Sequence, residues 1–434
     1  MKRFLKILIA CLLAQPAKAQ DTPLSLKEAV QTALQKNLGI VLVKNEAEIA
    51  KINNNWGNAG AMPVVSASLN RSFASNNIQQ VLSNGTEIKR NGAAVNNFNA
   101  GALLSWRFFD GMRMFATKSR LEELEKMGAV QITRQSNQIV YNTLLVYYNL
   151  IRLRQQATAI REMIALNQER LKIAEARFTI GTGAKPEVLQ AKVDLNEQQQ
   201  SLQTLENETE LSIIQLNQLL LQDPNTKIRI TDTVFTNSTA DFVQLSQQLS
   251  SANPDVILAQ SNLRVLKETR REINAQRLPS GTFTSNYNFV RSKSEAGFNL
   301  LNQNYGPSVA IGVAIPIFNG GVIRHQLKVN EIQQKNQELS IQELQLQLQS
   351  SFATALSNFN NARKMASMEE SNLELIRENN LINLERFRKM AITSVELRQS
   401  QTSYTDAQTR LSNARYQMNV AEAQMQLLAG SVKL

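Results

Sequence analysis

The side chains that usually carry enzyme chemistry are scarce in this sequence. The 434-residue chain contains one histidine, His325, and one cysteine, Cys11. That leaves no Cys/His zinc set, no disulfide framework and no spare histidine for a Ser-His-Asp triad. Phosphate-binding loops of the GxxxxGK or GxGxxG type are also absent from the sequence. The composition therefore argues against an enzyme and predicts no metal, cofactor or nucleotide, and His325, beside Arg324, is expected to be structural.

The first 19 residues have the composition of an export signal. Three basic residues accompany an apolar run over 4–13, and a small-x-small cleavage site at 17–19 precedes Gln20. We therefore predict a signal peptide over 1–19. The alternative is a lipoprotein box that ends at Cys11, but cleavage there would leave an apolar core of only about seven residues, shorter than most signal cores.

The positive charge of the chain does not indicate nucleic-acid binding. There are 47 Lys and Arg against 36 Asp and Glu, a formal net charge of +11. Four of the cations and none of the acids lie within 1–19, so cleavage would lower the net charge by 4, to +7. The remaining Lys and Arg alternate with Glu and form no basic stripe. No run of 18 apolar residues follows the leader, so a membrane contact would have to use strands.

Prolines and repeated motifs divide the chain into two modules. Prolines are absent from 64–185 and 317–434, and the whole chain has only 17 glycines, which predicts long helices. Motifs of the first half return in the second at a nearly constant offset of 209, as Arg177-Phe178 does at Arg386-Phe387. We predict repeat 1 over about 24–223 and repeat 2 over about 241–430.

Each repeat contains two segments with the alternation of β-strands. The predicted strands cover about 64–74, 98–109, 281–291 and 307–318. Their length suits tilted transmembrane strands, although a soluble β-sandwich would alternate similarly. Four strands cannot close a barrel, so closure in lipid would need several chains. Trp106 and Phe108 match an aromatic girdle at a membrane interface, and the polar stretches 76–97 and 291–306 predict loops at one barrel mouth.

Most of the remaining sequence has the heptad spacing of packed helices. Residues 113–178 would form one helix about 100 Å long at 1.5 Å per residue. The alternating segment 344–348 is also assigned to a helix, because its leucines fit helical spacing and no Gly or Pro lies near. The clearest seam steps by three and four residues through Leu397, Ser400, Tyr404, Ala407, Leu411, Ala414, Met418, Ala421, Met425 and Leu428. The same positions less 209 form a more polar seam, and a further seam runs from Phe352 to Phe387.

These features together resemble the TolC-like outer-membrane efflux proteins over essentially all of the chain after the leader. The resemblance rests on the duplicated helix-strand-strand-helix-helix order and on the paired turns 177–183 and 386–393. It implies a mixed α and β, mostly α protomer. Three protomers would form a 12-stranded transmembrane β-barrel continued by a long periplasmic α-helical barrel. The expected strand-helix switches are Pro63, Gly111, Pro279, Gly320 and Gly321.

The resemblance also implies the function. It predicts a trimeric outer-membrane channel that exports small molecules or secreted substrates in a tripartite efflux or secretion complex. The implied partners are outer-membrane lipid, a periplasmic membrane-fusion adaptor and an inner-membrane pump that supplies the energy. An alternative is a periplasmic coiled-coil adaptor or structural protein, which shares the heptads but leaves the four alternating segments unexplained.

Two helix-hairpin tips are expected to form the periplasmic entrance and to dock the adaptor. The docking residues implied are Phe178, Gly181, Thr182, Gly183, Pro186, Met390, Ala391 and Ile392. Glu396 stands where relatives begin a carboxylate ring, but Gln399 occupies the second acidic position, so three chains would supply three carboxylates. Glu396 is alternatively a helix N-terminal acid favoured by the dipole. Phe387 would either plug the entrance or pack the hairpin end, and packing is the prediction.

Overall fold

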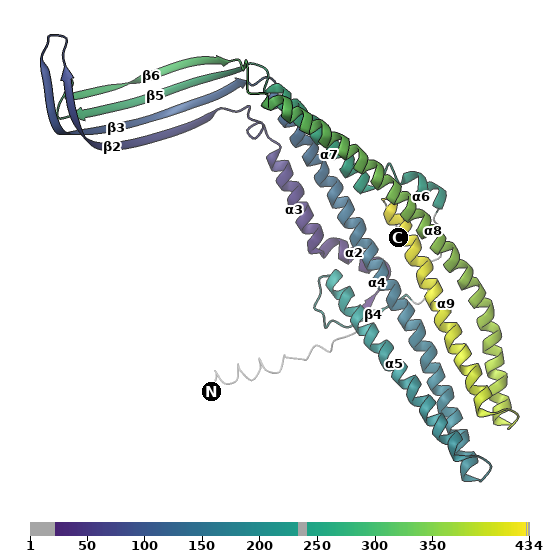
Figure 1. Cartoon of the computed structure of the whole chain (residues 1–434). Coiled ribbons are helices and arrows are strands. Elements are labelled where there is room, and N and C mark those ends of the chain that lie inside the picture. The colour runs from purple at the N-terminus through teal and green to yellow at the C-terminus, as the bar shows by residue number, and fades with distance from the viewer. Residues whose placement is uncertain (1–21, 233–240, 431, 433–434) are drawn as a thin grey trace, which may run out of the picture. The chain divides into compact units, whose positions relative to one another are not determined.

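The computed structural model describes residues 22–232, 241–430 and 432. The predicted signal peptide and Cys11 lie outside these residues. The element order (Figure 1) is β1 (Thr22–Leu24), α2 (Leu26–Lys36), α3 (Leu38–Asn53), β2 (Val64–Val81), β3 (Glu87–Phe109), α4 (Arg113–Thr179), α5 (Lys185–Leu219), β4 (Ile228–Ile230), α6 (Phe242–Gln248), α7 (Pro254–Ala275), β5 (Ser280–Ser294), β6 (Leu301–Ala314), α8 (Val322–Arg388) and α9 (Ser394–Leu428).

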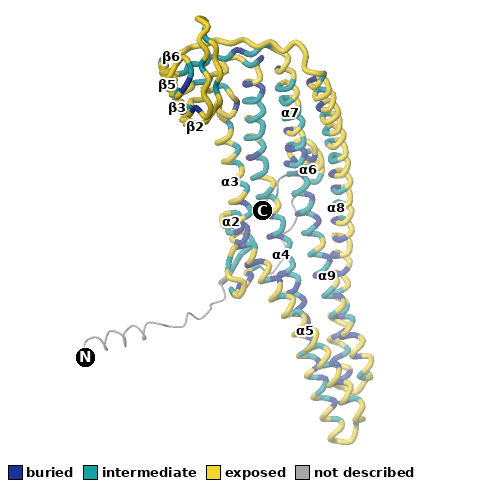
Figure 2. The backbone as a smooth tube through the Cα atoms, turned by 60° about the vertical axis from the view of Figure 1, so that its left-hand side comes forward, coloured by how far each residue is buried: buried dark blue, intermediate teal, exposed yellow. Residues whose placement is uncertain are grey.

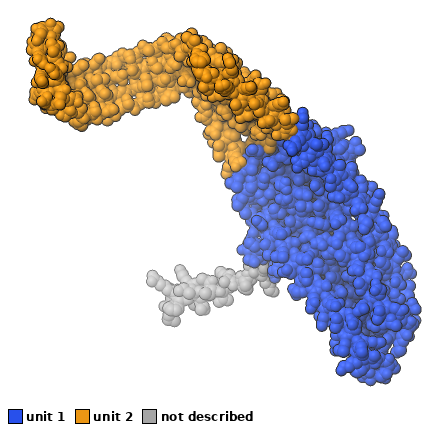
Figure 3. All heavy atoms as spheres, viewed as in Figure 1, with its two compact units in different colours: residues 1–44, 130–257, 342–434 blue, residues 45–129, 258–341 orange. Residues whose placement is uncertain are grey.

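The chain divides into two compact units, each built from segments of both halves of the sequence (Figure 3). Unit 1 takes residues 1–44, 130–257 and 342–434, and unit 2 takes residues 45–129 and 258–341. Unit 1 is almost entirely helical, whereas unit 2 contains the four long strands. Within the part of the chain that the structure describes, no helix combines the length and the apolar character needed to cross a membrane.

Long helices dominate the fold, as the sequence predicted. Helices α4 and α8 have 67 residues each, and α5 and α9 have 35 each. The predicted single helix over 113–178 is confirmed, and the alternating segment 344–348 lies inside α8. Helix α4 continues through Gly128, where α3 approaches closely: a Cβ on Gly128 would lie 2.8 Å from the Cβ of Ala47.

The heptad seams form the packed sides of the helices. In unit 1, α5, α4, α9 and α8 lie side by side, and buried residues follow their facing sides (Figure 2). Eight of the ten predicted positions in α9 are buried, namely Leu397, Ser400, Tyr404, Ala407, Leu411, Ala414, Ala421 and Met425. The α8 seam buries Phe352, Ala355, Phe359, Ala362, Ala366, Glu369, Asn380 and Phe387. The seam in α5 is less regular, because Asp194 is buried beside a half-buried Leu195.

The four long strands form one antiparallel sheet in the order β2-β3-β5-β6. The expected polar loops over 76–97 and 291–306 are wrong: β2 and β3 stay paired to Val81 and Glu87, and β5 and β6 to Lys293 and Leu301. Backbone hydrogen bonds pair the outer parts of these strands, and such pairing does not require the alternation of apolar residues from which the inner parts were predicted. Strand β6 ends at Ala314, four residues before the predicted limit of 318. Pro316, two residues further on, has no N–H to donate to a neighbouring strand.

The strand register gives the sheet two different faces. Paired residues share a face, so Val65, Leu104 and Val309 lie on one side with most large apolar residues. This apolar face consists mainly of Val65, Ala67, Leu69, Ala100, Ala102, Leu104, Trp106, Phe283, Tyr287, Phe289, Tyr305, Val309, Ile311 and Val313. The opposite face carries mostly Ser, Thr, Asn and Gly. Strands β2 and β6 each keep one unpaired edge among the described residues.

Candidate functional site at the helix-hairpin tips

The first tip, residues 180–184, is a tight turn closed by backbone hydrogen bonds. The amides of Thr182 and Gly183 donate to the carbonyl of Arg177 at 2.9 and 3.0 Å, and the Gly181 amide donates to Phe178 O at 3.1 Å. Gly181 has a φ of 80°, the left-handed conformation that ends many helices. Pro186 lies in the first turn of α5, where its missing N–H costs no helical hydrogen bond.

The second tip, residues 389–393, repeats this geometry without glycine. The amide of Ala391 donates to Arg386 O at 2.8 Å, and the amide of Met390 donates to Phe387 O at 3.1 Å. Met390 takes the left-handed conformation, with φ 62°. The duplication therefore preserves the backbone of the turn even though it changes the residue.

The same substitution pattern recurs throughout the described chain. Its three non-glycine residues with positive φ each stand 209 residues from a glycine with positive φ. The pairs are Met112 with Gly321, Leu221 with Gly430, and Met390 with Gly181. A β-carbon in this conformation is strained, so one copy of each turn carries a cost that the other avoids.

The two tips therefore respond in opposite directions to substitution. Met390→Gly is expected to stabilise the second tip by up to about 1 kcal/mol, because strain is removed and some chain entropy is lost. Gly181→Ala should destabilise the first tip by about 1 kcal/mol, and only through the backbone, since a Cβ there would meet nothing within 4 Å. Limited proteolysis at each tip measures both changes. Faster cleavage of Met390→Gly than of wild type would contradict the strain at this turn.

Glu396 caps the N-terminus of α9. The Thr393 amide and hydroxyl donate to Glu396 Oε2 at 2.8 and 2.9 Å, and the Glu396 amide donates back to Thr393 Oγ1 at 3.2 Å. These hydrogen bonds, from the Thr393 backbone first and its side chain second, hold the pKa of the exposed Glu396 carboxyl below its ordinary value. The cap therefore contributes stability above the unfolded-state pKa of about 4.3. That contribution is lost as the pH falls through the lowered folded-state pKa.

Phe387 packs, whereas its repeat partner Phe178 is exposed. The Phe387 side chain is 1% exposed and lies with Leu384 and Leu397, against which Leu166, Ile173 and Ile392 pack. The guanidinium of Arg177 lies 4.4 Å from the centre of the Phe387 ring, and Arg177 Nη2 donates to Phe387 O. Phe178 is 47% exposed. Equal positions in the repeat thus have different surroundings, because only Phe387 faces the end of a neighbouring hairpin.

A buried ion pair above the tips ties three helices together. Arg170 of α4 donates through Nη2 to Asp194 Oδ2 of α5, and through Nη1 to Gln401 Oε1 of α9 at 3.3 Å. Arg398 of α9 lies 3.7 Å from Asp194 Oδ1, to which Gln190 donates at 2.8 Å. The Arg170 and Asp194 side chains are 1% and 9% exposed. We did not predict this cluster from the sequence; the only signal was Asp194 beside the α5 seam.

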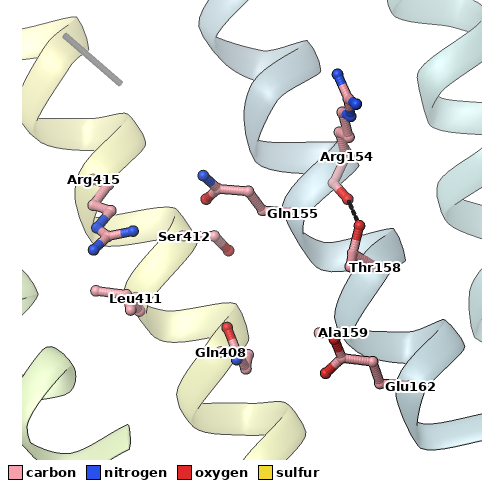
Figure 4. Close-up of a pocket in the computed structure, with 9 residues that line it drawn as sticks. All are labelled: Arg154, Gln155, Thr158, Ala159, Glu162, Gln408, Leu411, Ser412 and Arg415. Atoms are coloured by element: carbon pink, nitrogen blue, oxygen red, sulfur yellow. Dashed lines mark hydrogen bonds between the residues drawn. The ribbon is translucent and has the colours of Figure 1, made fainter. Parts of the chain in front are cut away.

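A cavity of about 330 Å³ lies between α4 and α9 in the same unit (Figure 4). Its two arginines already have partners: Arg154 Nη1 donates to Ile230 O at 2.8 Å, and Arg415 pairs with Glu370 at 2.6 Å. Glu162 accepts a hydrogen bond from Tyr404. Among the residues that the structure describes, no group of three or more His, Cys, Asp or Glu side chains is arranged to hold a metal ion.

The predicted switches lie in the connections between strands and helices. Gly111, with φ 70°, follows β3, and Gly320 and Gly321, with φ 65° and 79°, precede α8. A Cβ on Gly111 would clash with the carbonyl oxygen of Ala275, so only glycine fits there. Pro63 and Pro279 immediately precede β2 and β5. His325 is exposed in the first turn of α8.

Comparison with known proteins identifies relatives of this arrangement. The chain is similar in structure to the CmeC outer membrane channel of Campylobacter jejuni, with a TM-score of 0.80 and 16% identity over 93% of this chain and 85% of that one. It is similar to VceC of Vibrio cholerae, with a TM-score of 0.76 and 15% identity over 94% and 96%. The open-state MtrE channel of Neisseria gonorrhoeae gives a TM-score of 0.69 and 14% identity over 94% and 89%.

These structural likenesses establish the fold, and a family model goes further. No curated protein sequence matches the chain. The model described as "Outer membrane efflux protein" matches residues 29–220 and 245–431, which is most of the chain and includes both tips. The chain therefore belongs to the outer membrane efflux protein family.

Proposed function

We propose that this chain forms a homotrimeric exit duct, gated at its helix-hairpin tips, in a tripartite efflux or secretion complex. Membership of the outer membrane efflux protein family makes the chain an outer-membrane channel. The trimer, the gate and the partners are what we propose beyond family membership. The main support is a sheet with an exposed apolar face and two unpaired edges, in a chain whose long helices end in exposed hairpin tips.

The unpaired sheet edges support closure by several copies. Open edges are not tolerated in lipid, because every N–H and C=O needs a partner there. Pairing β6 of one copy with β2 of the next satisfies both edges at once. Three copies of four strands give a 12-stranded barrel. The apolar face then meets lipid, and the face rich in Ser, Thr and Asn lines the duct.

The tips suit contact with a protein partner. Four large apolar side chains at or beside them are 47–69% exposed, namely Phe178, Ile180, Met390 and Val395. Exposed apolar groups of this kind often mark interaction sites. We assign this surface to a periplasmic membrane-fusion adaptor. The adaptor connects the duct to an inner-membrane pump that supplies the energy, so the duct itself needs no catalytic residues.

Glu396 gives the proposed entrance a negative charge. The carboxylate is ionised at neutral pH, as an ordinary exposed glutamate is, and the hydrogen bonds from Thr393 lower its pKa further. In a trimer, three copies would present three carboxylates, without a second ring at Gln399. The capping role and the ring are compatible, because Thr393 engages Oε2 and leaves Oε1 available.

Planar-bilayer conductance of the purified protein tests this function. We expect small, steady currents from wild-type trimers, blocked by divalent cations, and a loss of that block in Glu396→Gln. Glu187→Gln, an acid in the first turn of α5 at the other tip, is the matched control and should keep the block. Currents with equal block in wild type and Glu396→Gln would remove Glu396 from the entrance. A protein that stays monomeric and never enters membranes would contradict the duct and favour the coiled-coil adaptor.

A further inference from the structure

Three cations lie in two adjacent cross-strand rows of the apolar face of the sheet, where charges are unexpected. The register places Arg71 of β2, Phe98 of β3 and Arg291 of β5 in one cross-strand row. The next row outward contains Phe73, Asn96 and Lys293. Rows nearer the helices on this face carry residues such as Leu69, Ala100 and Phe289. We call the two outer rows the basic rows.

The basic rows are positive on one side of the sheet only. The opposite face at this level carries uncharged residues, including Asn70, Asn97 and Ser292. No carboxylate occupies the basic rows. Charges placed only for solubility would be expected on the polar face as well, so their confinement to the apolar face needs another explanation.

The three cations lack counter-charges within the described chain. Arg71, Arg291 and Lys293 are exposed, and none forms an ion pair with a described residue. Arg71 makes only a long hydrogen bond to Asn96 Oδ1, at 3.5 Å, and its guanidinium lies 4.8 Å from the centre of the Phe73 ring. Stacking on an aromatic ring holds the guanidinium without neutralising it. An external anion can therefore provide the missing negative charge.

The height of the basic rows identifies where that anion would lie. Gly281 and Arg291 are ten residues apart along β5, which is about 33 Å along the strand. In a barrel strand tilted by about 40°, the rise is about 25 Å, the height of a typical apolar band. Aromatic residues mark both ends of this band, with Trp106 and Phe283 at one and Phe289 and Tyr305 at the other. The cations thus lie at the level of lipid headgroups.

We propose that Arg71, Arg291 and Lys293 bind the phosphate groups of membrane lipids, in the leaflet beside the β2–β3 turn. The inference rests on the proposed function, because it needs the apolar face to contact lipid. Guanidinium groups match phosphate with two parallel hydrogen bonds, and Lys293 adds a third positive charge in the adjacent row. The lipid chains would cover the apolar rows while the headgroup satisfies the cations, so a phosphorylated lipid fits the site better than a free anion.

Lipid retention by the purified protein tests the proposal. Wild type is loaded in micelles with phosphatidic acid or phosphatidylcholine, and bound lipid is counted by native mass spectrometry. We expect wild type to retain phosphatidic acid preferentially, and Arg71→Gln/Arg291→Gln/Lys293→Gln to retain roughly tenfold less. Lys44→Gln/Lys335→Gln/Lys364→Gln removes three exposed cations of the helices and should change retention less than about twofold. If the first triple variant fails to assemble, Arg291→Gln alone should still show weaker retention.

The other outcomes overturn the proposal. Equal retention by wild type and the basic-row variant would show that these cations do not bind lipid. An equal loss in the control variant would indicate a bulk charge effect. Displacement of the lipid by the same concentration of inorganic phosphate would indicate a site for a soluble anion. Conductance of the same samples separates the two ideas: absent wild-type currents contradict the duct, whereas normal currents with lost lipid selectivity support the lipid site.

Discussion

Asp194→Ala is expected to lower the free energy of unfolding by about 3–5 kcal/mol. The substitution removes the carboxylate that neutralises Arg170, which is 1% exposed and cannot reach water without moving the helices. It also leaves Arg398 without its nearby acid, so two cations remain beside each other on adjoining helices. Denaturant unfolding followed by the helical circular dichroism signal measures the loss. Folded proteins have a margin of only about 5–15 kcal/mol, so the effect is large.

Two comparisons separate this effect from a general loss of charge. Glu206→Ala breaks an exposed ion pair, in which the Arg161 side chain is 57% exposed and the Glu206 side chain 45%. This substitution should lower the free energy of unfolding by less than about 1 kcal/mol. Arg170→Met/Asp194→Leu removes both buried charges and should recover most of the stability lost in Asp194→Ala. If Asp194→Ala costs no more than Glu206→Ala, the buried pair does not hold the three helices together.

Phe387→Ala should cost about 3–5 kcal/mol, while Phe178→Ala should cost less than about 1 kcal/mol. The two residues stand at equivalent places in the repeats, but they are 1% and 47% exposed. Truncating Phe387 leaves a cavity between Leu384 and Leu397 and removes the ring beneath Arg177. The expected result is a lower unfolding midpoint for Phe387→Ala and a nearly unchanged one for Phe178→Ala.

The same pair of variants distinguishes packing from a plug at the entrance. A packing residue lowers stability when truncated, and Phe387→Leu should restore part of the loss because it refills some of the cavity. A plug would change conductance with little change in unfolding. Equal, small stability losses in Phe387→Ala and Phe178→Ala would therefore reject the packing role that the structure indicates.

The helices and inner strands were predictable because their signals are local and repeated. A seam that steps by three and four residues has one buried side in any helical packing, and eight of its ten members in α9 are buried. Alternation of Val309, Ile311 and Val313 with small or polar residues likewise identified β6. The outer halves of β2 and β3 were missed because Asn, Ser and Gln pair through the backbone as well as apolar residues do.

The tip residues were only partly predictable. The sequence indicated a tight turn at Gly181 and an acid near the start of α9, but it left open whether Glu396 joins a carboxylate ring or is a helix N-terminal acid favoured by the dipole. The structure places Glu396 in the first turn of α9, where it forms reciprocal hydrogen bonds with Thr393. The spacing from Thr393 to Glu396 carried the capping-box signal in advance. Membership of the gate or of a carboxylate ring depends on neighbouring copies and stays a proposal.

By itself, the sequence determined the spacing of apolar residues along the chain. That spacing shows where helices and strands run, which side of each is apolar, and that one order of elements occurs twice. These properties follow from contacts between residues a few positions apart. Only the tertiary structure decided which distant residues meet, such as Arg170 with Asp194 and Gln401, and why Phe387 is buried while Phe178 is not. Burial and charge pairing depend on which helix lies opposite, and that is set by the packing of the whole unit. The cross-strand rows that align Arg71 with Arg291 have the same origin, because register is a relation between strands that no single strand contains.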